Sequence, residues 1–147
     1  EIVSRDWSSD VCSSDLPVFR MSLIFEAVED IHRGQKSRDL SVLHGKRVHA
    51  VAGIGNPDRF FRQLRTLGIE AVPHAFPDHH PFSSGDLIFP ACDAIVMTEK
   101  DAVKCRRLKA PPGVVCYAMS VHAELEPTFR DFILQRLRDP ALGRAPS

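Results

Sequence analysis

The seven residues FPDHHPF at 76–82 place one acid and two adjacent histidines between two prolines and two phenylalanines. A histidine titrates near neutral pH, so His79 or His80 could take up or release a proton during a reaction. Asp78 could accept a ring N–H and thereby orient one of the two imidazoles. The same residue types could also bind a metal ion or cap a helix. The chemistry therefore depends on what the fold places beside them.

A second polar stretch, AGIGNPDRFF at 52–61, has the composition of a tight turn that leads into a helix. Gly53 and Gly55 permit the turn, and Asn56 is a good helix N-cap. The exposed N–H groups at such a helix start could bind an anion, or the stretch could be only a well-formed turn. It is not a dinucleotide-binding GxGxxG sequence, because the third glycine position is Asp58.

The third stretch is MTEKDAVKC at 97–105. Thr98 and Asp101 have the T-x-x-D spacing of a capping box, which would account for both in structural terms. Glu99 and Lys100 remain, and Lys100 could meet a phosphate or pair with Glu99 or Asp101. The sequence leaves a capped helix and a helix that lines a site equally open. We assign both of these stretches to the vicinity of the substrate or its phosphate.

These stretches need a framework, and the hydrophobic pattern predicts one in which strands alternate with helices. Predicted strands cover 47–52, 69–75, 93–97 and 113–118, and predicted helices cover 57–67, 99–108 and 127–138. This order indicates an α/β fold, a layered α/β/α domain with a mostly parallel sheet. Pro73 indicates that its strand lies at the edge of the sheet or that the strand ends near this residue. Each polar stretch follows a strand, where ligands gather in open α/β sheets.

Composition narrows the class of protein. Nineteen basic residues balance nineteen acidic ones, so a general attraction to nucleic acid is not indicated. No apolar run approaches the roughly 20 residues of a membrane span, and we expect the chain itself to be soluble. The four cysteines form no CxxC pair, which disfavours a structural zinc site or a disulfide framework, so we assign no metal ligands. Arg59, Arg62 and Arg65 form either a solvated helix face or a contact with anionic lipid headgroups.

The two ends of the chain differ from the rest. Residues 1–16 contain the repetitive SSDVCSSDL and have no helical or strand periodicity. We interpret them as a non-native or disordered leader, of the kind that translated sequencing adapters leave. Residues 17–47 are expected to be a linker and the start of the domain, with a short strand or helical turn followed by a loop. The α/β domain is predicted at 48–138, and a flexible tail at 139–147.

Three sequences, VHAVAGIGNPDRFF, HAFPDHHPF and MTEKDAVKC, occur in this order and carry a family resemblance. From about residue 17 to 137 the chain resembles the C-terminal domain of the tetraacyldisaccharide 4′-kinase (lipid A 4′-kinase) family. The resemblance implies a P-loop-type kinase that uses ATP and Mg²⁺. It implies transfer of the γ-phosphate to the 4′-hydroxyl of a tetraacyldisaccharide 1-phosphate, a lipid A precursor. It also implies a position on the cytoplasmic face of the Gram-negative inner membrane.

The chain departs from that family in one respect, because it has no P-loop sequence GxxxxGK[ST]; Gly45 and Lys46 are followed by Arg47. The resemblance implies that the P-loop, the magnesium-binding acids and a catalytic aspartate belong to an N-terminal domain. We therefore expect a truncated chain that is inactive alone, with ATP and Mg²⁺ bound mainly by that other domain. A histidine of FPDHHPF would then pair with the aspartate and help to deprotonate the 4′-hydroxyl. We favour His79, which directly follows Asp78, over His80.

Two other functions are compatible with parts of the sequence. The chain could be a non-catalytic α/β binding module, which needs no catalytic partner domain. Asp-His-His is also the motif of the DHH phosphoesterases, which bind manganese. Those enzymes need further aspartates on earlier strands, and residues 17–77 contain no DxD sequence. The phosphoesterase interpretation is therefore the weakest of the three.

Overall fold

The computed structural model describes residues 17–138. Residues 25–121 form one compact unit, and residues 17–24 and 122–138 belong to a second unit. The predicted leader at 1–16 and the predicted tail at 139–147 lie outside the described residues. The predicted domain boundary at residue 48 stays a prediction.

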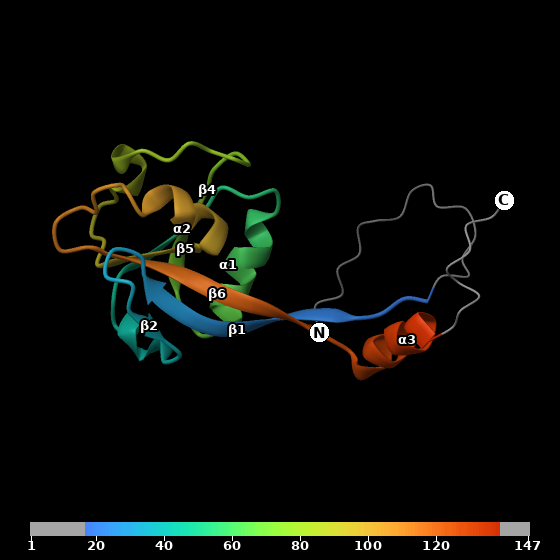
Figure 1. Ribbon diagram of the computed structural model, residues 1–147. Helices are drawn as coiled ribbons and strands as arrows, with labels where there is room; N and C mark the ends of the chain where they lie inside the picture. The colour runs from blue at the N-terminus through green and yellow to red at the C-terminus, as the bar shows by residue number, and fades with distance from the viewer. Residues whose placement is uncertain (1–16, 139–147) are drawn as a thin grey trace. The chain divides into compact units, whose positions relative to one another are not determined.

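A six-stranded sheet with the strand order β2-β1-β6-β5-β3-β4 forms the framework of the fold (Figure 1). The strands β4, β3, β5 and β6 pair in parallel, whereas β1 and β2 are antiparallel. The predicted, mostly parallel sheet is therefore confirmed. The strands span Met21–Asp30 (β1), Lys36–Ser37 (β2), Val48–Ala52 (β3), Ala71–Ala75 (β4), Ala94–Thr98 (β5) and Val115–Leu125 (β6).

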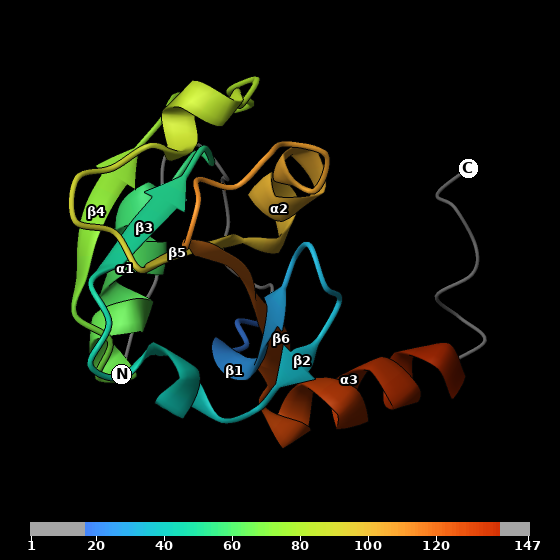
Figure 2. The same cartoon turned by 90° about the vertical axis from the view of Figure 1, so that its left-hand side faces the viewer.

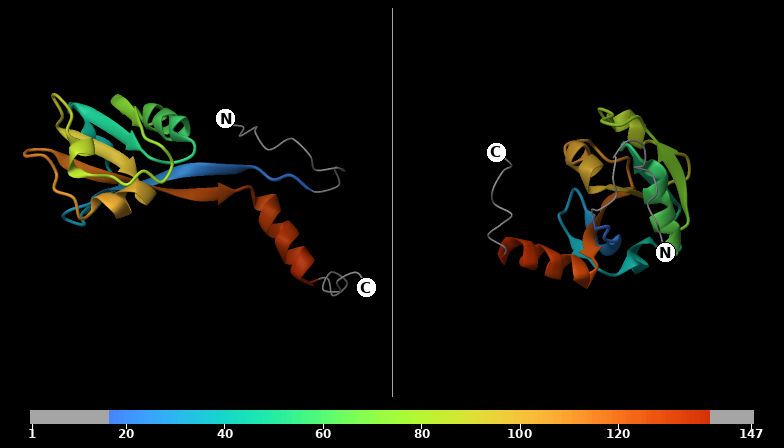
Figure 3. Two further views of the ribbon diagram at one scale, coloured as in Figure 1. Left: turned by 90° about the horizontal axis from the view of Figure 1, so that it is seen from above. Right: turned by 90° about the vertical axis from the view of Figure 1, so that its right-hand side faces the viewer.

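Within residues 25–121, two hydrophobic cores cover the two faces of the sheet, one under α1 (Pro57–Thr66) and one under α2 (Glu99–Cys105). Phe60, Phe61 and Leu64 of α1 pack with Ala50 and its same-face neighbours. The intervening strand residues pack with α2 on the opposite face (Figures 2 and 3). Because both faces are covered, every residue of β3 is buried, and VHAVA reads as a continuous apolar run except for one histidine. The layered α/β/α prediction is confirmed.

Local sequence signals explain the boundaries of α1. The Asn56 side chain accepts a hydrogen bond from the Arg59 N–H at 3.2 Å, and Pro57 occupies the first turn. Gly68, with φ of 76°, follows the helix in the left-handed conformation that favours glycine. All three features agree with the sequence prediction. β4 lies at the sheet edge, as the proline at its centre predicts.

Three expectations about the extent of secondary structure were wrong, and two of them concern strands. Residues 17–47 contain the ten-residue strand β1, the short β2 and the 3₁₀ helix η1 (Leu40–Leu43), where a short element and a loop were expected. The strand expected at 113–118 is β6, which continues to Leu125. The reason is mutual pairing. The Ile31 N–H donates to the Cys116 carbonyl at 3.0 Å, and the Glu126 N–H donates to the Arg20 carbonyl at 3.2 Å. These bonds make β1 and β6 antiparallel neighbours, and each strand supplies the hydrogen bonds that extend the other.

The helix expected at 99–108 is also shorter, because α2 ends at Cys105. Its last residue packs in the core with Cys116, and both thiols are fully buried. Burial raises the pKa of Cys105 to about 11 and that of Cys116 to about 12. These two cysteines therefore serve as packing residues and not as reactive thiolates.

In the second unit, α3 (Pro127–Arg138) forms as predicted at 127–138. Phe19 packs against Phe129 and Phe132, with ring centroids 5.1 Å apart in both pairs. Ile133 and Leu137 of the same helix are exposed within the described part of the chain. Between residues 17 and 138, no helix combines the length and the hydrophobicity that crossing a bilayer requires.

Candidate functional site

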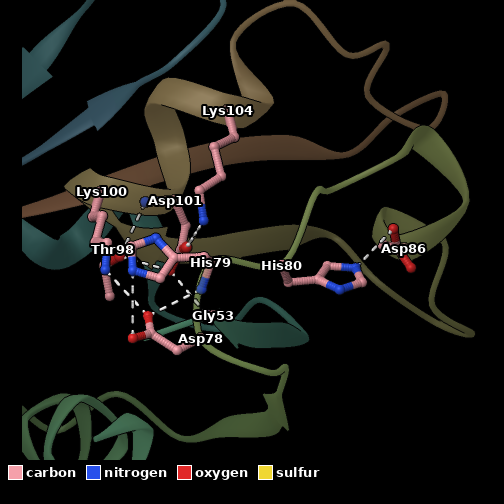
Figure 4. A network of polar contacts seen from close by, with 9 residues as sticks. All are labelled: Gly53, Asp78, His79, His80, Asp86, Thr98, Lys100, Asp101 and Lys104. Carbon is pink, nitrogen blue, oxygen red and sulfur yellow. Dashed lines mark hydrogen bonds and ion pairs between the residues drawn. The ribbon is translucent and has the colours of Figure 1, made fainter. Parts of the chain in front are cut away.

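The carboxyl ends of three neighbouring strands bring the three polar stretches together (Figure 4). Gly53 follows β3, the loop from Phe76 to Phe82 follows β4, and Thr98 ends β5. β3 lies between β4 and β5, and all three run in the same direction. Parallel strands end at the same edge of a sheet, so the loops meet there. The predicted position of the polar stretches, directly after strand ends, is thus confirmed. The functional roles of their residues stay predictions.

Asp78 and Lys100 form the centre of this edge. The Lys100 ammonium donates to Asp78 Oδ1 at 3.1 Å, and both side chains are about half exposed. This hydrogen bond is the main cause that lowers the pKa of Asp78, and nearby His79 adds to it. Lys100 therefore pairs with an acid from another loop rather than with either of the neighbours considered from the sequence. Glu99 instead accepts a hydrogen bond from the Ser120 hydroxyl at 2.8 Å.

His79 is the most exposed member of the cluster, with 75% of its side chain accessible. Its backbone has φ of 61°, a left-handed conformation that is uncommon for a residue with a Cβ. Its main-chain N–H donates to Asp78 Oδ1 at 3.0 Å, which helps to hold the turn. Its ring Nε2 lies 3.6 Å from Asp78 Oδ2, longer than a hydrogen bond. The ring is thus beside Asp78 but free to meet another group, and the orienting hydrogen bond considered from the sequence is not formed.

His80 points away from this cluster (Figure 4). Its Nε2 lies 3.3 Å from Asp86 Oδ2, and its ring packs against Phe76 and Phe82 with centroids 4.7 and 4.9 Å away. Asp86 also accepts from the Ser83 N–H and hydroxyl, both at 2.8 Å, and these bonds lower its pKa. Ser83 and Asp86 thereby form a capping box at the start of a short helix, η2 (Ser84–Leu87). The structure therefore gives the two adjacent histidines different surroundings.

Asp101 is the buried acid of the site, with no exposed surface. Its Oδ2 accepts from the Gly53 N–H at 3.0 Å and from the Thr98 hydroxyl at 2.7 Å. Its Oδ1 lies 3.3 Å from the Lys104 ammonium. Thr98 Oγ1 in turn accepts from the Asp101 N–H at 3.2 Å, which confirms the predicted capping relation. The hydrogen bond to Gly53 was not predicted from the sequence, because it joins α2 to the loop after β3.

The two glycines of the AGIGN turn are not equivalent. A Cβ on Gly53 would lie 3.1 Å from the Phe82 ring and 3.3 Å from Asp101 Oδ1, so no larger residue fits without a shift. A Cβ on Gly55 would meet only Asp78 Oδ2, at an ordinary 3.7 Å. Gly53 therefore allows close contact between two loops. Gly55 places the turn beside the acid of the cluster.

Sequence reasoning missed Lys104 and a pair of stacked histidines. Lys104 lies three residues after Asp101 on a helix, and that spacing could have identified it. His49 Nδ1 and His74 Nε2 are 2.8 Å apart on neighbouring strands, and Phe89 stacks on both rings. Burial, and secondarily His49, lowers the pKa of His74. No local signal predicts this pair, because 25 residues separate the two histidines.

Within residues 17–138, no group of three or more His, Cys, Asp or Glu side chains could hold a metal ion. Carboxylate oxygens are the protein ligands that Mg²⁺ prefers. In the site described here, Asp78 and Asp101 are each engaged by a lysine.

The fold matches that of a solved kinase structure. The chain is similar to the apo form of LpxK from Aquifex aeolicus in complex with ATP, with a TM-score of 0.56 and 22% sequence identity. The match covers 86% of this chain and 38% of that protein. The match shows that the α/β/α layers described above share their fold with the matched part of that protein.

The family model for tetraacyldisaccharide-1-P 4′-kinase matches residues 3–138, and the chain belongs to this family. A tetraacyldisaccharide 4′-kinase from Xanthomonas euvesicatoria pv. vesicatoria is 44% identical over 119 residues, which are 81% of this chain and 33% of that protein. One from Aromatoleum aromaticum is 51% identical over 89 residues, 60% of this chain and 26% of that protein. The chain thus spans about a third of the length of the first relative. The family resemblance is confirmed, and the phosphoesterase alternative is set aside.

Proposed function

We propose that this chain supplies one part of an ATP-dependent kinase that phosphorylates the 4′-hydroxyl of a tetraacyldisaccharide 1-phosphate, a lipid A precursor. The family match over residues 3–138 carries the proposal. The cluster of Asp78, His79 and Lys100 at the carboxyl ends of parallel strands supports it, because this edge is where α/β folds bind ligands.

In this proposal His79 is the catalytic residue of the segment. Phosphoryl transfer forms a bond from the sugar oxygen to the γ-phosphorus while the bond to the leaving ADP oxygen breaks, and the hydroxyl proton must leave. An exposed imidazole can take up that proton, directly or by pairing with a catalytic aspartate elsewhere in the kinase. Asp78 Oδ2 lies 3.6 Å from the ring Nε2. The packing of His80 and its contact with Asp86 support His79 over His80 for this role.

Lys100 adds a positive charge beside His79 in the same cluster. Its partner Asp78 is half exposed, so an anionic substrate group can compete for the ammonium. The edge around Lys100 is formed by two groups of residues. One is the turn after β3, with Gly53, Gly55 and Asn56, and the other is the start of α2, with Thr98, Glu99 and Asp101. We assign these residues to positioning rather than to chemistry.

ATP and Mg²⁺ are assigned to other parts of the kinase in this proposal. The 147 residues contain no GxxxxGK[ST] sequence to surround the β- and γ-phosphates, and the described residues offer no metal cluster. About two thirds of the first relative's length lies outside its match to this chain, which leaves room for both functions. The lipid substrate places the kinase at the cytoplasmic face of the inner membrane. The arginines of α1, at 59, 62 and 65, are the candidate contact with anionic headgroups.

A chimeric enzyme tests the proposal. The third of the Xanthomonas kinase that aligns with this chain is replaced by the corresponding residues of this chain, and ³²P transfer from ATP to the disaccharide 1-phosphate is measured. We expect the chimera to be active and the isolated chain to be inactive. His79→Ala in the chimera should lower kcat about 10²–10⁴-fold, the usual contribution of an acid–base group. His44→Ala, at another exposed histidine, is the matched control and should leave kcat unchanged. A chimera that folds and shows no transfer would refute the proposed function.

A further inference from the structure

The buried carboxylate of Asp101 links a loop, a strand end and a helix that all reach the candidate site. It accepts from Gly53 of the loop after β3 and from Thr98 at the end of β5, and it contacts Lys104 of α2. A helix cap needs only the Thr98 relation. The bond to Gly53 spans 48 residues of sequence and joins the loop after β3 to α2, beyond Val51 and Met97, the last residue pair of the β3–β5 ladder.

The link continues from Gly53 to the histidine loop. Phe82 lies so close to Gly53 that an added Cβ would be 3.1 Å from its ring. The Lys104 ammonium lies 5.5 Å from the centre of the same ring. Phe82 ends the FPDHHPF stretch, and it also packs against His80 at 4.9 Å. The contacts thus form a ring that runs from Asp101 to Lys104, Phe82, Gly53 and back to Asp101. This ring lies next to the exposed cluster of Asp78, His79 and Lys100.

These contacts join α2, which carries Lys100, to the loop that carries His79. Lys100 precedes Asp101 in α2, and His79 belongs to the loop that Phe82 anchors. Their only direct connection in the described residues passes through the half-exposed Asp78. A surface ion pair of this kind gives weak positional control. A fully buried, hydrogen-bonded carboxylate gives strong control, because each of its donors would lose its partner if the loops moved apart.

We propose that Asp101 is a positioning residue that fixes the spacing between Lys100 and His79 by holding Gly53 and, through it, Phe82. This inference rests on the proposed function for its catalytic consequence, but its structural part does not. No asparagine rotamer reproduces the arrangement. One of its two terminal atoms is an NH₂ group, which would face the Lys104 ammonium or the Gly53 N–H, and both are donors.

The structural part is tested in the 147-residue chain by NMR. In Asp101→Ala we expect hydrogen exchange of the Gly53 amide to accelerate about 10- to 100-fold, because the amide loses a bond to a charged acceptor. The ring resonances of His79 and the Nζ-adjacent resonances of Lys100 should shift, although the side-chain partner described for both residues is Asp78. Asp30→Ala is the matched control. Asp30 is also buried and accepts two backbone N–H groups, from His32 and Arg33, so its loss should lower the unfolding midpoint without moving the His79 signals.

Gly53→Ala tests the same link without removing the carboxylate, and it serves if Asp101→Ala does not fold. Its Cβ would press on Phe82 and on Asp101 Oδ1, so the same His79 and Lys100 resonances should shift. Unchanged His79 and Lys100 signals in a folded Asp101→Ala or Gly53→Ala chain would overturn the proposal. It would also be overturned if Asp30→Ala moved those signals equally, because they would then report general destabilisation.

The catalytic part is tested in the chimera. Asp101→Ala should lower kcat about 10- to 100-fold through misplacement of the reacting groups, with KM for ATP nearly unchanged. A fall in expression or stability with normal kcat would assign Asp101 to folding alone and overturn the catalytic part. If the unmutated chimera has no activity, the proposed function fails, and the NMR comparison still decides whether Asp101 positions His79.

Discussion

The left-handed backbone of His79 allows stability and catalysis to be separated at one position. A residue with a Cβ pays about 1–2 kcal/mol in this conformation, whereas glycine adopts it without that cost. Glycine loses about 0.5–1 kcal/mol of this advantage through its more flexible unfolded chain. His79→Gly should therefore be more stable than His79→Ala by about 1 kcal/mol.

The histidine ring contributes little that either variant would lose, because three quarters of the side chain is exposed. His79→Gly is consequently expected to be at least as stable as the unmodified chain. For a domain of this length, about 1 kcal/mol corresponds to a rise of about 3–5 °C in Tm relative to His79→Ala. Thermal unfolding of the 147-residue chain, followed by circular dichroism, measures this difference.

The activity of the same two variants should change in the opposite direction. In the chimeric kinase both should lose kcat about 10²–10⁴-fold, because both lack the imidazole. A gain in stability that accompanies a loss of activity is the expected mark of a residue kept for function in a costly conformation. The reasoning is refuted if both variants unfold at clearly lower temperature than the parent while kcat stays normal, since FPDHHPF would then be a structural loop.

Three further predictions concern the surroundings of that residue. His80→Ala should lower the free energy of unfolding by about 1–2 kcal/mol, because its ring packs between two phenylalanines, and should reduce kcat far less than loss of its neighbour. Lys100→Met should raise the pKa of Asp78 toward its ordinary value of about 3.9, which carboxyl ¹³C titration detects. His74→Phe should remove a loss of Tm between pH 7.5 and 5, because burial and His49 depress the pKa of the native imidazole.

The sign of each pH effect follows from the direction of the pKa shift. The folded pKa of Asp78 is lowered, so its contribution to stability is complete above its unfolded pKa and disappears as the pH falls through the folded value. The folded pKa of His74 is also lowered, so its contribution is complete above about pH 6.5 and decreases as the pH falls below that value.

Specific results would contradict these three predictions. An unchanged Asp78 titration in Lys100→Met would show that the ion pair does not persist in solution. A His74→Phe chain with the same acid sensitivity as the parent would assign that sensitivity to other groups. A larger loss of kcat in His80→Ala than in His79→Ala would exchange the roles of the two histidines.

The sequence by itself determined the features that depend on neighbouring residues. Asn56, Pro57 and Gly68 mark the ends of α1 because caps and helix stops act within one turn of the chain. The apolar run at 48–52 identified a buried parallel strand, and the order of strands and helices identified the layers. Three motifs at strand ends were enough to identify the family and the edge of the sheet that carries the site.

Only the tertiary structure decided which polar groups meet at that edge. Lys100 pairs with Asp78 across 22 residues, and Asp101 reaches Gly53 across 48. Such partners depend on strand order and loop packing, which no local pattern encodes. The two adjacent histidines look equivalent in the sequence, but a single positive φ turns His79 outward while aromatic packing holds His80. The extent of β1 and β6 was likewise decided by their pairing, because a strand lasts as long as its neighbour supplies hydrogen bonds.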